Sequence, residues 1–257
     1  MKFFSFLFFI FSLFSLLTSC SSEKDKKSLT DVPVHTIIFM DKTQSVNVNK
    51  SFVAQKYQQI LRTIVEQNIR QKGDKLEVYF IHENTSKAKA LSVVCRTEKE
   101  NTDAMNLTDK EGAQTTFDLM LDREKMMILR QATSKMAVQN ISVSQRFTDI
   151  WGSLGVISKV AESGVEVKAY FLSDMIESMR GAGRRDFHSN PPQNNIEAEK
   201  WAKTDAQALK QYTLGSADIK LALPFEPTSS THENNPNITI YWTTLFQELG
   251  ASVVEEI

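Results

Sequence analysis

The sequence predicts an α/β fold with a central, mostly parallel sheet that is flanked by helices on both faces. Segments 35–40 and 165–172 have the apolar content of strands that are buried inside a sheet. Between such segments the apolar spacing changes to the period of an amphipathic helix. Alternation of strands and helices along most of the chain therefore indicates a parallel sheet rather than an antiparallel barrel.

The first half of the chain continues this alternation. Residues 49–70 carry an apolar helical face, and segments 76–82 and 88–96 have the pattern of the second and third strands. Residues 97–116 are polar, show no clear period and are predicted to form a loop. A second helix is predicted over 117–138. Because a helix between two strands must bury one face, we expect these apolar side chains to pack in the core: Leu119, Met120, Met127, Ile128 and Met136.

The second half of the chain begins with a helix that Thr148 or Asp149 can cap and that ends before Gly164. After the strand at 165–172, the Gly and Pro residues of segment 181–193 predict a long loop. The remaining predicted elements are a helix over 196–212, a strand over 217–223, a helix over 238–249 and an edge strand over 252–257.

The N-terminal segment predicts where the protein works. Residues 3–17 form an apolar run shorter than the ~20 residues of a membrane-spanning helix, after a basic Lys2, which describes a secretory signal. Leu-Thr-Ser-Cys at 17–20 resembles the bacterial lipobox, and this resemblance implies cleavage before Cys20 and acylation of that residue. An ordinary signal peptide is the alternative.

The predicted organisation has three parts. Residues 1–19 are a lipoprotein signal peptide, residues 20–32 contain the lipidated Cys20 and a polar tether, and residues 33–257 form one domain. We therefore expect the protein in the bacterial cell envelope. The acyl chains would hold it in a lipid bilayer, namely the outer membrane, on its periplasmic or its outer surface.

Composition excludes some partner classes. The chain has 30 Lys and Arg against 31 Asp and Glu, a formal net charge of −1, and no long run of one sign. Nothing in this balance indicates nucleic-acid binding. Once Cys20 is lipidated, Cys95 is the remaining thiol, so no internal disulfide can form. We expect Cys95 to be a small buried apolar residue.

Side-chain oxygens follow the first strand at alternate positions. Asp41, Thr43 and Ser45 come directly after the buried run 35–40. A period of two keeps alternate side chains on one side of an extended chain, so these three can converge on one point. A carboxylate and two hydroxyls are hard oxygen donors, which suit Mg²⁺ or Ca²⁺. The alternative is that Asp41 and Ser45 merely turn the loop toward the next helix.

A second carboxylate lies in an equivalent place. Asp174 follows the strand at 165–172, in the sequence Leu-Ser-Asp. Ligands of open parallel sheets bind at the carboxyl ends of the strands, near the point where the strand order reverses. Asp41 and Asp174 are therefore expected to be neighbours across the ends of two adjacent strands.

These residues carry a family resemblance. Asp41, Thr43 and Ser45 after a buried strand resemble the DxSxS signature of von Willebrand factor type A domains, with Thr43 in the place of the first Ser. Thr148 is similar to the second-loop Thr of that family, and Asp174 to its third-loop Asp. The resemblance covers roughly residues 33–257 and implies the Rossmann-like fold of that family. One departure is Met175, where many members have Gly.

The resemblance also implies a metal-ion-dependent adhesion site (MIDAS). In such a site Thr43, Ser45 and Thr148 bind the metal, and Asp41 and Asp174 act partly through coordinated waters. The implied metal is Mg²⁺, with Mn²⁺ or Ca²⁺ as alternatives. A carboxylate of a protein partner would complete the shell, so binding would depend on metal while no reaction is catalysed.

Other chemistries lack their motifs. The sequence contains no GxxxxGK[ST] loop, no GxGxxG fingerprint and no GxSxG elbow, and its four His residues lack metal-ligand spacing. Arg184 and Arg185 lie on the long loop beyond Asp174, which makes them candidate partner-binding residues. The alternative is a solvated loop without that role.

Three functions remain open. The first is a membrane-anchored module for adhesion or assembly that binds a protein through the metal, without enzymatic activity. The second is an extracytoplasmic hydrolase that uses Asp41 and Asp174 around Mg²⁺. The third is an accessory lipoprotein with a vestigial metal site.

Overall fold

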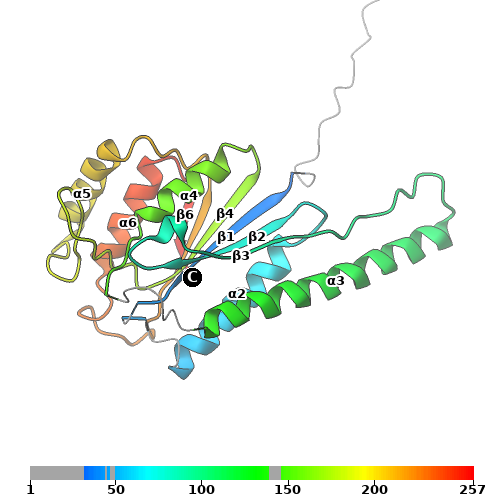
Figure 1. Ribbon diagram of the computed structural model, residues 1–257, viewed down its shortest axis with the longest axis horizontal. Coiled ribbons are helices and arrows are strands. Elements are labelled where there is room, and N and C mark those ends of the chain that lie inside the picture. The colour runs from blue at the N-terminus through cyan, green and yellow to red at the C-terminus, as the bar shows by residue number, and fades with distance from the viewer. Residues whose placement is uncertain (1–31, 44, 47–49, 139–145) are drawn as a thin grey trace, which may run out of the picture. The chain divides into compact units, whose positions relative to one another are not determined.

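A six-stranded sheet lies at the centre of the unit that runs from Pro33 to Ile257 (Figure 1). This computed structural model describes residues 32–43, 45–46, 50–138 and 146–257. The predicted signal peptide and nearly all of the tether, including Cys20, lie outside the described residues. The strands are β1 (Val34–Asp41), β2 (Lys75–Ile81), β3 (Lys89–Val94), β4 (Glu166–Leu172), β5 (Asp218–Ala222) and β6 (Val253–Glu256).

The sheet has the strand order β3-β2-β1-β4-β5-β6. Every neighbouring pair is parallel except β2 and β3, which are antiparallel. β1 lies between β2 and β4, so the chain builds the sheet outward in one direction and then in the other. The switch point of the order lies beside β1, where parallel sheets place their ligands. The predicted fold class, a mostly parallel sheet flanked by helices on both faces, is confirmed.

Helices cover both faces of the sheet because the strand side chains alternate between two apolar clusters. Ile38 and Met40 of β1 pack with α2 and α3, whereas Ile37 and Phe39 pack with α4, α5 and α6. The helices are α2 (Ser51–Asn68), α3 (Leu107–Ala137), α4 (Gly152–Ala161), α5 (Asn195–Ala208) and α6 (Pro236–Glu248), with a short 3₁₀ helix at Thr85–Lys87. Cys95 is buried, as predicted.

Helix α3 differs most from the sequence-based expectation. The predicted loop over 97–116 is wrong for its second half, because α3 begins at Leu107. The predicted core packing of Leu119, Met120 and Met127 is also wrong, since these side chains are 56%, 55% and 50% exposed. The physical reason is that α3 contacts α2 and β3 along one side only, while its N-terminal part extends beyond the sheet (Figure 1). The buried residues of α3 are Leu121, Ile128, Ala132 and Met136.

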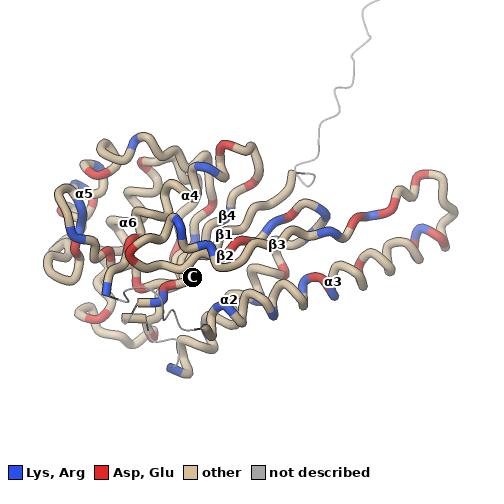
Figure 2. The backbone as a smooth tube through the Cα atoms, in the orientation of Figure 1, with Lys and Arg blue, Asp and Glu red and all other residues tan. Residues whose placement is uncertain are grey.

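Charged side chains are mixed in sign along the chain. Lys and Arg alternate with Asp and Glu over most of the unit, including α3 (Figure 2). No large region of one sign indicates a nucleic-acid surface in the part of the chain that the structure describes. Within the same ranges, no helix has the length and apolar content needed to cross a membrane.

Candidate metal centre

The loop after β1 brings the predicted first-loop oxygens together. Oδ1 of Asp41 accepts hydrogen bonds from the backbone N–H of Thr43 at 2.8 Å and from its hydroxyl at 2.5 Å. Oγ1 of Thr43 also lies 3.1 Å from Oγ of Ser45. Asp41 and Thr43 are buried, while Ser45 is exposed. The sequence therefore gives a compact cluster of three oxygen donors at the carboxyl end of β1.

The loop after β4 adds the second carboxylate. The hydroxyl of Ser173 donates to Oδ2 of Asp41 at 2.6 Å and accepts from the backbone N–H of Met175 at 3.0 Å. Oδ1 of Asp174 accepts from the backbone N–H of Ile176 at 3.1 Å. Because β1 and β4 are adjacent parallel strands, these bonds fix the two loops side by side. Ser173 was not predicted as a site residue, although it directly precedes Asp174.

Both carboxylates lie in buried surroundings that penalise negative charge. Burial, and then the charge of Asp174, raises the pKa of Asp41. Burial raises the pKa of Asp174 as well, and a hydrogen bond from Ser45 offsets this only in part. No ion pair in the described ranges neutralises either side chain. A cation between them would relieve this cost, because it favours the charged form of both acids.

Thr148 lies on a third loop, which hydrogen bonds join to the loops after β2 and β4. Its backbone N–H donates to Oγ of Ser178 at 2.8 Å, and the N–H of Asp149 donates to the carbonyl of His82 at 3.1 Å. His82 follows β2 and Ser178 follows the β4 loop, so Thr148 lies over the end of β1, which is between them. Its hydroxyl oxygen is buried and makes no hydrogen bond within the described ranges. A buried polar atom without a partner is costly and indicates a missing ligand.

Tyr57 is a buried residue near the carboxylates that the sequence did not single out. It belongs to the apolar face of α2 and is 1% exposed, so its spacing indicates only a core residue. Its hydroxyl oxygen is buried, and no residue in the part of the chain that the structure describes is its hydrogen-bond partner. Burial first, and then the charges of Asp41 and Asp174, raise the pKa of this phenol, which places it within electrostatic reach of both carboxylates. No signal in the spacing separates this tyrosine from its apolar neighbours.

A buried ion-pair network braces the second loop against the third. One guanidinium nitrogen of Arg184 bonds Oδ1 of Asp149 at 2.6 Å and also bonds Oε1 of Glu177. The other oxygen of Glu177 accepts from the backbone N–H of Ile150 at 2.7 Å. The guanidinium also lies 4.9 Å from the ring of Trp151. This network holds Thr148 in place from the C-terminal side of its loop.

Arg185 is engaged in a similar way. Its guanidinium makes two hydrogen bonds to Asp205, at 2.7 and 2.9 Å, and lies 4.6 Å from the ring of Trp201. Asp205 also accepts from the hydroxyl of Tyr241 at 2.8 Å. This geometry favours a structural role for Arg184 and Arg185, because the bidentate and stacked contacts already occupy them. Their predicted role in partner binding stays a prediction.

Met175 has a left-handed backbone conformation directly after Asp174. Its φ is +61°, in the left-handed region that glycine adopts without strain. The side chain is fully buried, and the carbonyl accepts from the indole N–H of Trp242 at 2.7 Å. This turn therefore holds Met175 in a conformation that glycine would adopt without strain, next to Asp174.

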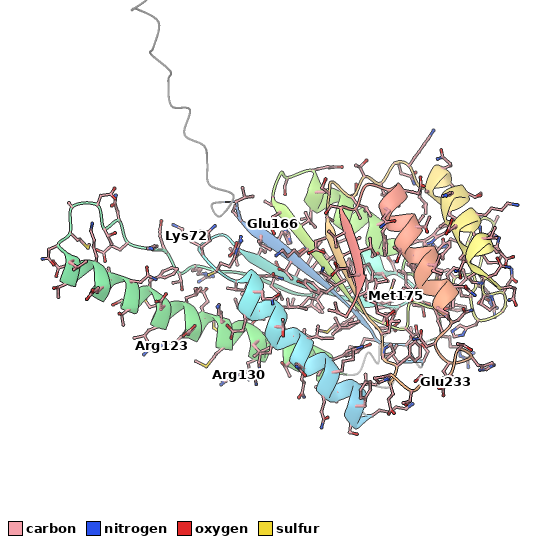
Figure 3. The ribbon with its side chains drawn as sticks, turned by 180° about the vertical axis from the view of Figure 1, so that it is seen from behind. Lys72, Arg123, Arg130, Glu166, Met175 and Glu233 are labelled. Carbon is pink, nitrogen blue, oxygen red and sulfur yellow. The ribbon has the colours of Figure 1, made fainter. Side chains whose placement is uncertain are left out.

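A cleft of about 490 Å³ opens at the site. Ser45 and Asp174 lie on its wall, and its apolar lining includes Phe52, Ile176 and Phe225. Figure 3 shows Glu233, which also lines this cleft, on a loop near the N-terminal end of α2. The cleft gives a partner access to the predicted metal ligands from solvent.

The donor set fits a hard divalent cation. The five predicted ligands supply two carboxylates and three hydroxyls: Asp41, Thr43, Ser45, Thr148 and Asp174. Within the described ranges there is no group of three or more His, Cys, Asp or Glu that could hold a metal. A site built mainly from hydroxyls and two carboxylates suits Mg²⁺, Mn²⁺ or Ca²⁺ better than metals that prefer thiolate or imidazole.

Known proteins resemble this chain in structure only, and at low sequence identity. No family model matches the sequence, and no curated protein matches it. The PilB minor pilin from Streptococcus sanguinis is 12% identical, with a TM-score of 0.41 over 88% of this chain and 57% of that chain. A von Willebrand factor type A protein from Catenulispora acidiphila is 10% identical, with a TM-score of 0.37 over 85% and 41%.

A third match is proximal thread matrix protein 1 from the mussel byssus, in a structure with a zinc-occupied MIDAS motif. It is 12% identical, with a TM-score of 0.29 over 88% of this chain and 41% of that chain. The chain thus spans about half the length of the structures that it matches. All three TM-scores are below 0.5, so the fold assignment rests on the strand order of this chain.

Proposed function

We propose that this protein is a binding module for adhesion or assembly that holds a protein partner through a divalent cation. The observation that carries the proposal is the pairing of Asp41 with Asp174. The two buried carboxylates repel each other electrostatically without a neutralising ion pair in the described residues, and the buried hydroxyl of Thr148, on a third loop, has no hydrogen-bond partner among them. This combination costs stability unless a cation and its waters offset it.

The residues have separate roles in this proposal. Thr43, Ser45 and Thr148 would contact the cation, and Asp41 and Asp174 would hold coordinated waters. The cation would supply a positive charge that attracts a carboxylate of the partner. The apolar wall of the adjacent cleft, which includes Phe52 and Phe225, would contact the side chains next to that carboxylate.

A hydrolase that uses Asp41 and Asp174 around Mg²⁺ is the alternative. It requires a base or nucleophile beside the carboxylates. Lys42 is the adjacent basic residue, and burial lowers its pKa to about 8. Its amine, however, already donates to the carbonyl of Met136. The geometry therefore favours binding over catalysis.

We further propose that the module is lipid-anchored through Cys20 in the bacterial cell envelope, at the outer membrane. The support is the lipobox-like sequence that precedes Cys20. Two or more acyl chains hold a protein stably on a bilayer, whereas one chain is marginal. Mass spectrometry of the mature N-terminus would test this, and an unmodified, soluble mature protein would contradict it.

Metal titration tests the central proposal. Mg²⁺ should bind the wild-type protein by calorimetry and raise its melting temperature, with a gain of roughly 2.7 kcal/mol at a concentration ~100 times the dissociation constant. Asp41→Asn should abolish both effects, and Ser45→Ala should weaken them less because it removes a neutral oxygen. Asp118→Asn, a change on the distant and exposed surface of α3, is the matched control and should respond like the wild type.

Three outcomes separate the functions. A Mg²⁺ response without hydrolysis of p-nitrophenyl phosphate or p-nitrophenyl acetate supports the binding module. A Mg²⁺ response with hydrolysis that Asp41→Asn abolishes supports the hydrolase. A wild-type protein that responds to none of Mg²⁺, Mn²⁺ and Ca²⁺ has a vestigial site.

A further inference from the structure

Exposed apolar side chains concentrate on α3. Of the ten large apolar side chains that are exposed in the described ranges, five lie on α3 and a sixth, Val138, is its C-terminal cap. Single exposed apolar residues are ordinary on a protein surface, but a contiguous group indicates an interaction site. Four of the five fall within little more than two helical turns, at Leu119, Met120, Met126 and Met127.

These four side chains share one face. Residues seven apart are nearly two turns apart, so Leu119 aligns with Met126 and Met120 aligns with Met127. Arg123 and Arg130 lie between and beyond these pairs, on the side of α3 that faces away from the sheet (Figure 3). We call these six residues the outward stripe. Ile128 and Ala132, on the opposite side of the helix, are fully buried.

The charge of the outward stripe is purely positive. Arg123 and Arg130 are exposed, and no ion pair among the described residues involves either of them. The acidic residues nearest to the stripe are Asp122, which is exposed, and Glu124, whose carboxylate accepts hydrogen bonds from Thr97 and from the backbone N–H of Arg96; both are more than a quarter turn from Arg123 around the helix. The stripe thus combines apolar contact area with two cations that have no counter-charge on the same face.

We propose that the outward stripe binds an amphipathic helix of a protein partner that carries Asp or Glu beside its own apolar residues. Repeats of seven are the spacing at which two helices pack side by side. Methionine adapts its shape to different partners, which suits a recognition surface. The carboxylates of the partner would pair with Arg123 and Arg130 and would set the register.

The same observations disfavour two other occupants. A second copy of this chain would oppose arginine to arginine, because the stripe has no acidic residue to offer. An anionic lipid surface would bring its headgroups against the flanking Asp122 as well as the arginines, whereas a partner helix can place its carboxylates opposite Arg123 and Arg130 alone. The stripe is also short, so contact through it alone would be weak and transient. This proposal is independent of the metal site and stands or falls separately.

Two synthetic peptides test the proposal on the domain, residues 33–257. Both are labelled helical peptides of about three heptads with Leu at positions a and d; one has Glu and the other Lys at e and g. The Glu peptide should bind about ten-fold more tightly than the Lys peptide, because two ion pairs differ between the complexes. Arg123→Glu with Arg130→Glu should reverse this preference, and Met120→Ser with Met127→Ser should weaken both peptides about ten-fold.

Matched controls lie on the same helix. Leu107→Ser removes an exposed apolar side chain outside the stripe, and Lys110→Glu reverses an exposed charge outside it, so neither should change binding. Equal affinity for the two peptides, or no binding of either, overturns the proposal. The proposal is also overturned if sedimentation shows that the wild-type domain forms a dimer and that Met120→Ser with Met127→Ser abolishes this dimer. Binding only to vesicles of phosphatidylcholine and phosphatidylserine overturns it as well.

Discussion

The carboxyl edge of the sheet and the outward stripe of α3 depart from ordinary burial in opposite directions. At the sheet edge, ionisable and hydroxyl groups are buried, among them Asp41, Thr148 and Asp174. On α3, large apolar side chains are exposed. A buried polar group and an exposed apolar patch are the two observations of burial that are informative about function. Each region costs the isolated protein free energy that a ligand would recover.

The two regions also differ in how firmly they are held. The loops of the edge are joined by hydrogen bonds and by the pairing of Arg184 with Asp149 and Glu177. The N-terminal part of α3, by contrast, has no buried residue before Leu121. A binding site for a small cation needs fixed ligands, whereas a surface that packs against another helix needs only accessible area. The difference therefore fits two different kinds of partner.

The largest difference in stability between the two regions should be seen when one arginine of each is replaced by alanine. Arg184→Ala leaves Glu177 and Asp149 without their cation, and should lower the free energy of unfolding by about 3–5 kcal/mol. Arg130→Ala removes an exposed arginine from α3 and should change it by less than about 0.5 kcal/mol. Urea unfolding of both variants at neutral pH measures the difference. Similar losses for the two variants would mean that the edge network contributes nothing beyond an ordinary surface ion pair.

The second largest difference in stability is expected between alanine variants of two neighbouring residues of α3. Ile128 is fully buried, so Ile128→Ala should cost about 2–5 kcal/mol. Met127 is 50% exposed, and Met127→Ala should be close to neutral because alanine is also the better helix former. Thermal and urea unfolding would check this. A loss above ~2 kcal/mol for Met127→Ala would show that the outward stripe is packed in solution.

The pH dependence of the metal-free protein sharpens the description of the edge. The pKa of Asp41 is raised to about 7 by burial and by Asp174, so the folded state holds this proton more tightly than the unfolded state. The stabilising effect is complete below the ordinary carboxyl range near pH 4 and is lost as pH rises to about 7. The slope is about 1.4 kcal/mol per pH unit for one group.

Asp41→Asn should remove this slope. Its uncharged side chain keeps an acceptor for Thr43, and Ser173 can accept from its amide. Without metal, the variant should be more stable than the wild type at pH 7 and close to it at pH 4. Urea unfolding with EDTA at the two pH values gives the comparison. The wild type and the variant could instead have the same free energy of unfolding at pH 7. That result would mean that the carboxylates are hydrated and not buried.

The smallest expected effect concerns the turn at Met175. Both Met175→Ala and Met175→Gly lose a buried side chain, so both should be destabilised. The glycine variant should be the more stable of the two by about 1 kcal/mol, because alanine keeps the penalty of a left-handed backbone. The reverse order in thermal unfolding would show that this turn changes conformation in solution.

Strong patterns in the sequence allowed most of the fold to be predicted. The strands expected at 35–40, 76–82, 165–172 and 217–223 correspond to β1, β2, β4 and β5. Their apolar content is high because helices cover both faces. The first ten residues of α3 could not be predicted, because a helix segment that buries no face has no apolar period.

The site was predictable where its ligands are close in sequence. Asp41, Thr43 and Ser45 stand at alternate positions, and alternate side chains of an extended chain lie on the same side. Thr148 and Asp174 needed the family resemblance, because sequence spacing carries no information about loops that meet across a sheet edge. Tyr57 and Ser173 could not be found from pattern alone. Tyr57 has the spacing of a core residue of α2, and Ser173 is a residue type that is common in loops.

Lys42 gives the two regions a common element. It stands between Asp41 and Thr43, and its amine donates to the carbonyl of Met136 in the last turn of α3. A cation at a helix C-terminus interacts favourably with the helix dipole. Burial lowers the pKa of this amine to about 8, and the charge of Asp41 offsets part of that effect. A partner that shifts α3 and lengthens this hydrogen bond would also shift the positive charge of Lys42, which lies next to the predicted metal ligands Asp41 and Thr43. Allosteric linkage is reciprocal, so whatever factor a helix partner applies to cation affinity, the cation applies to the partner.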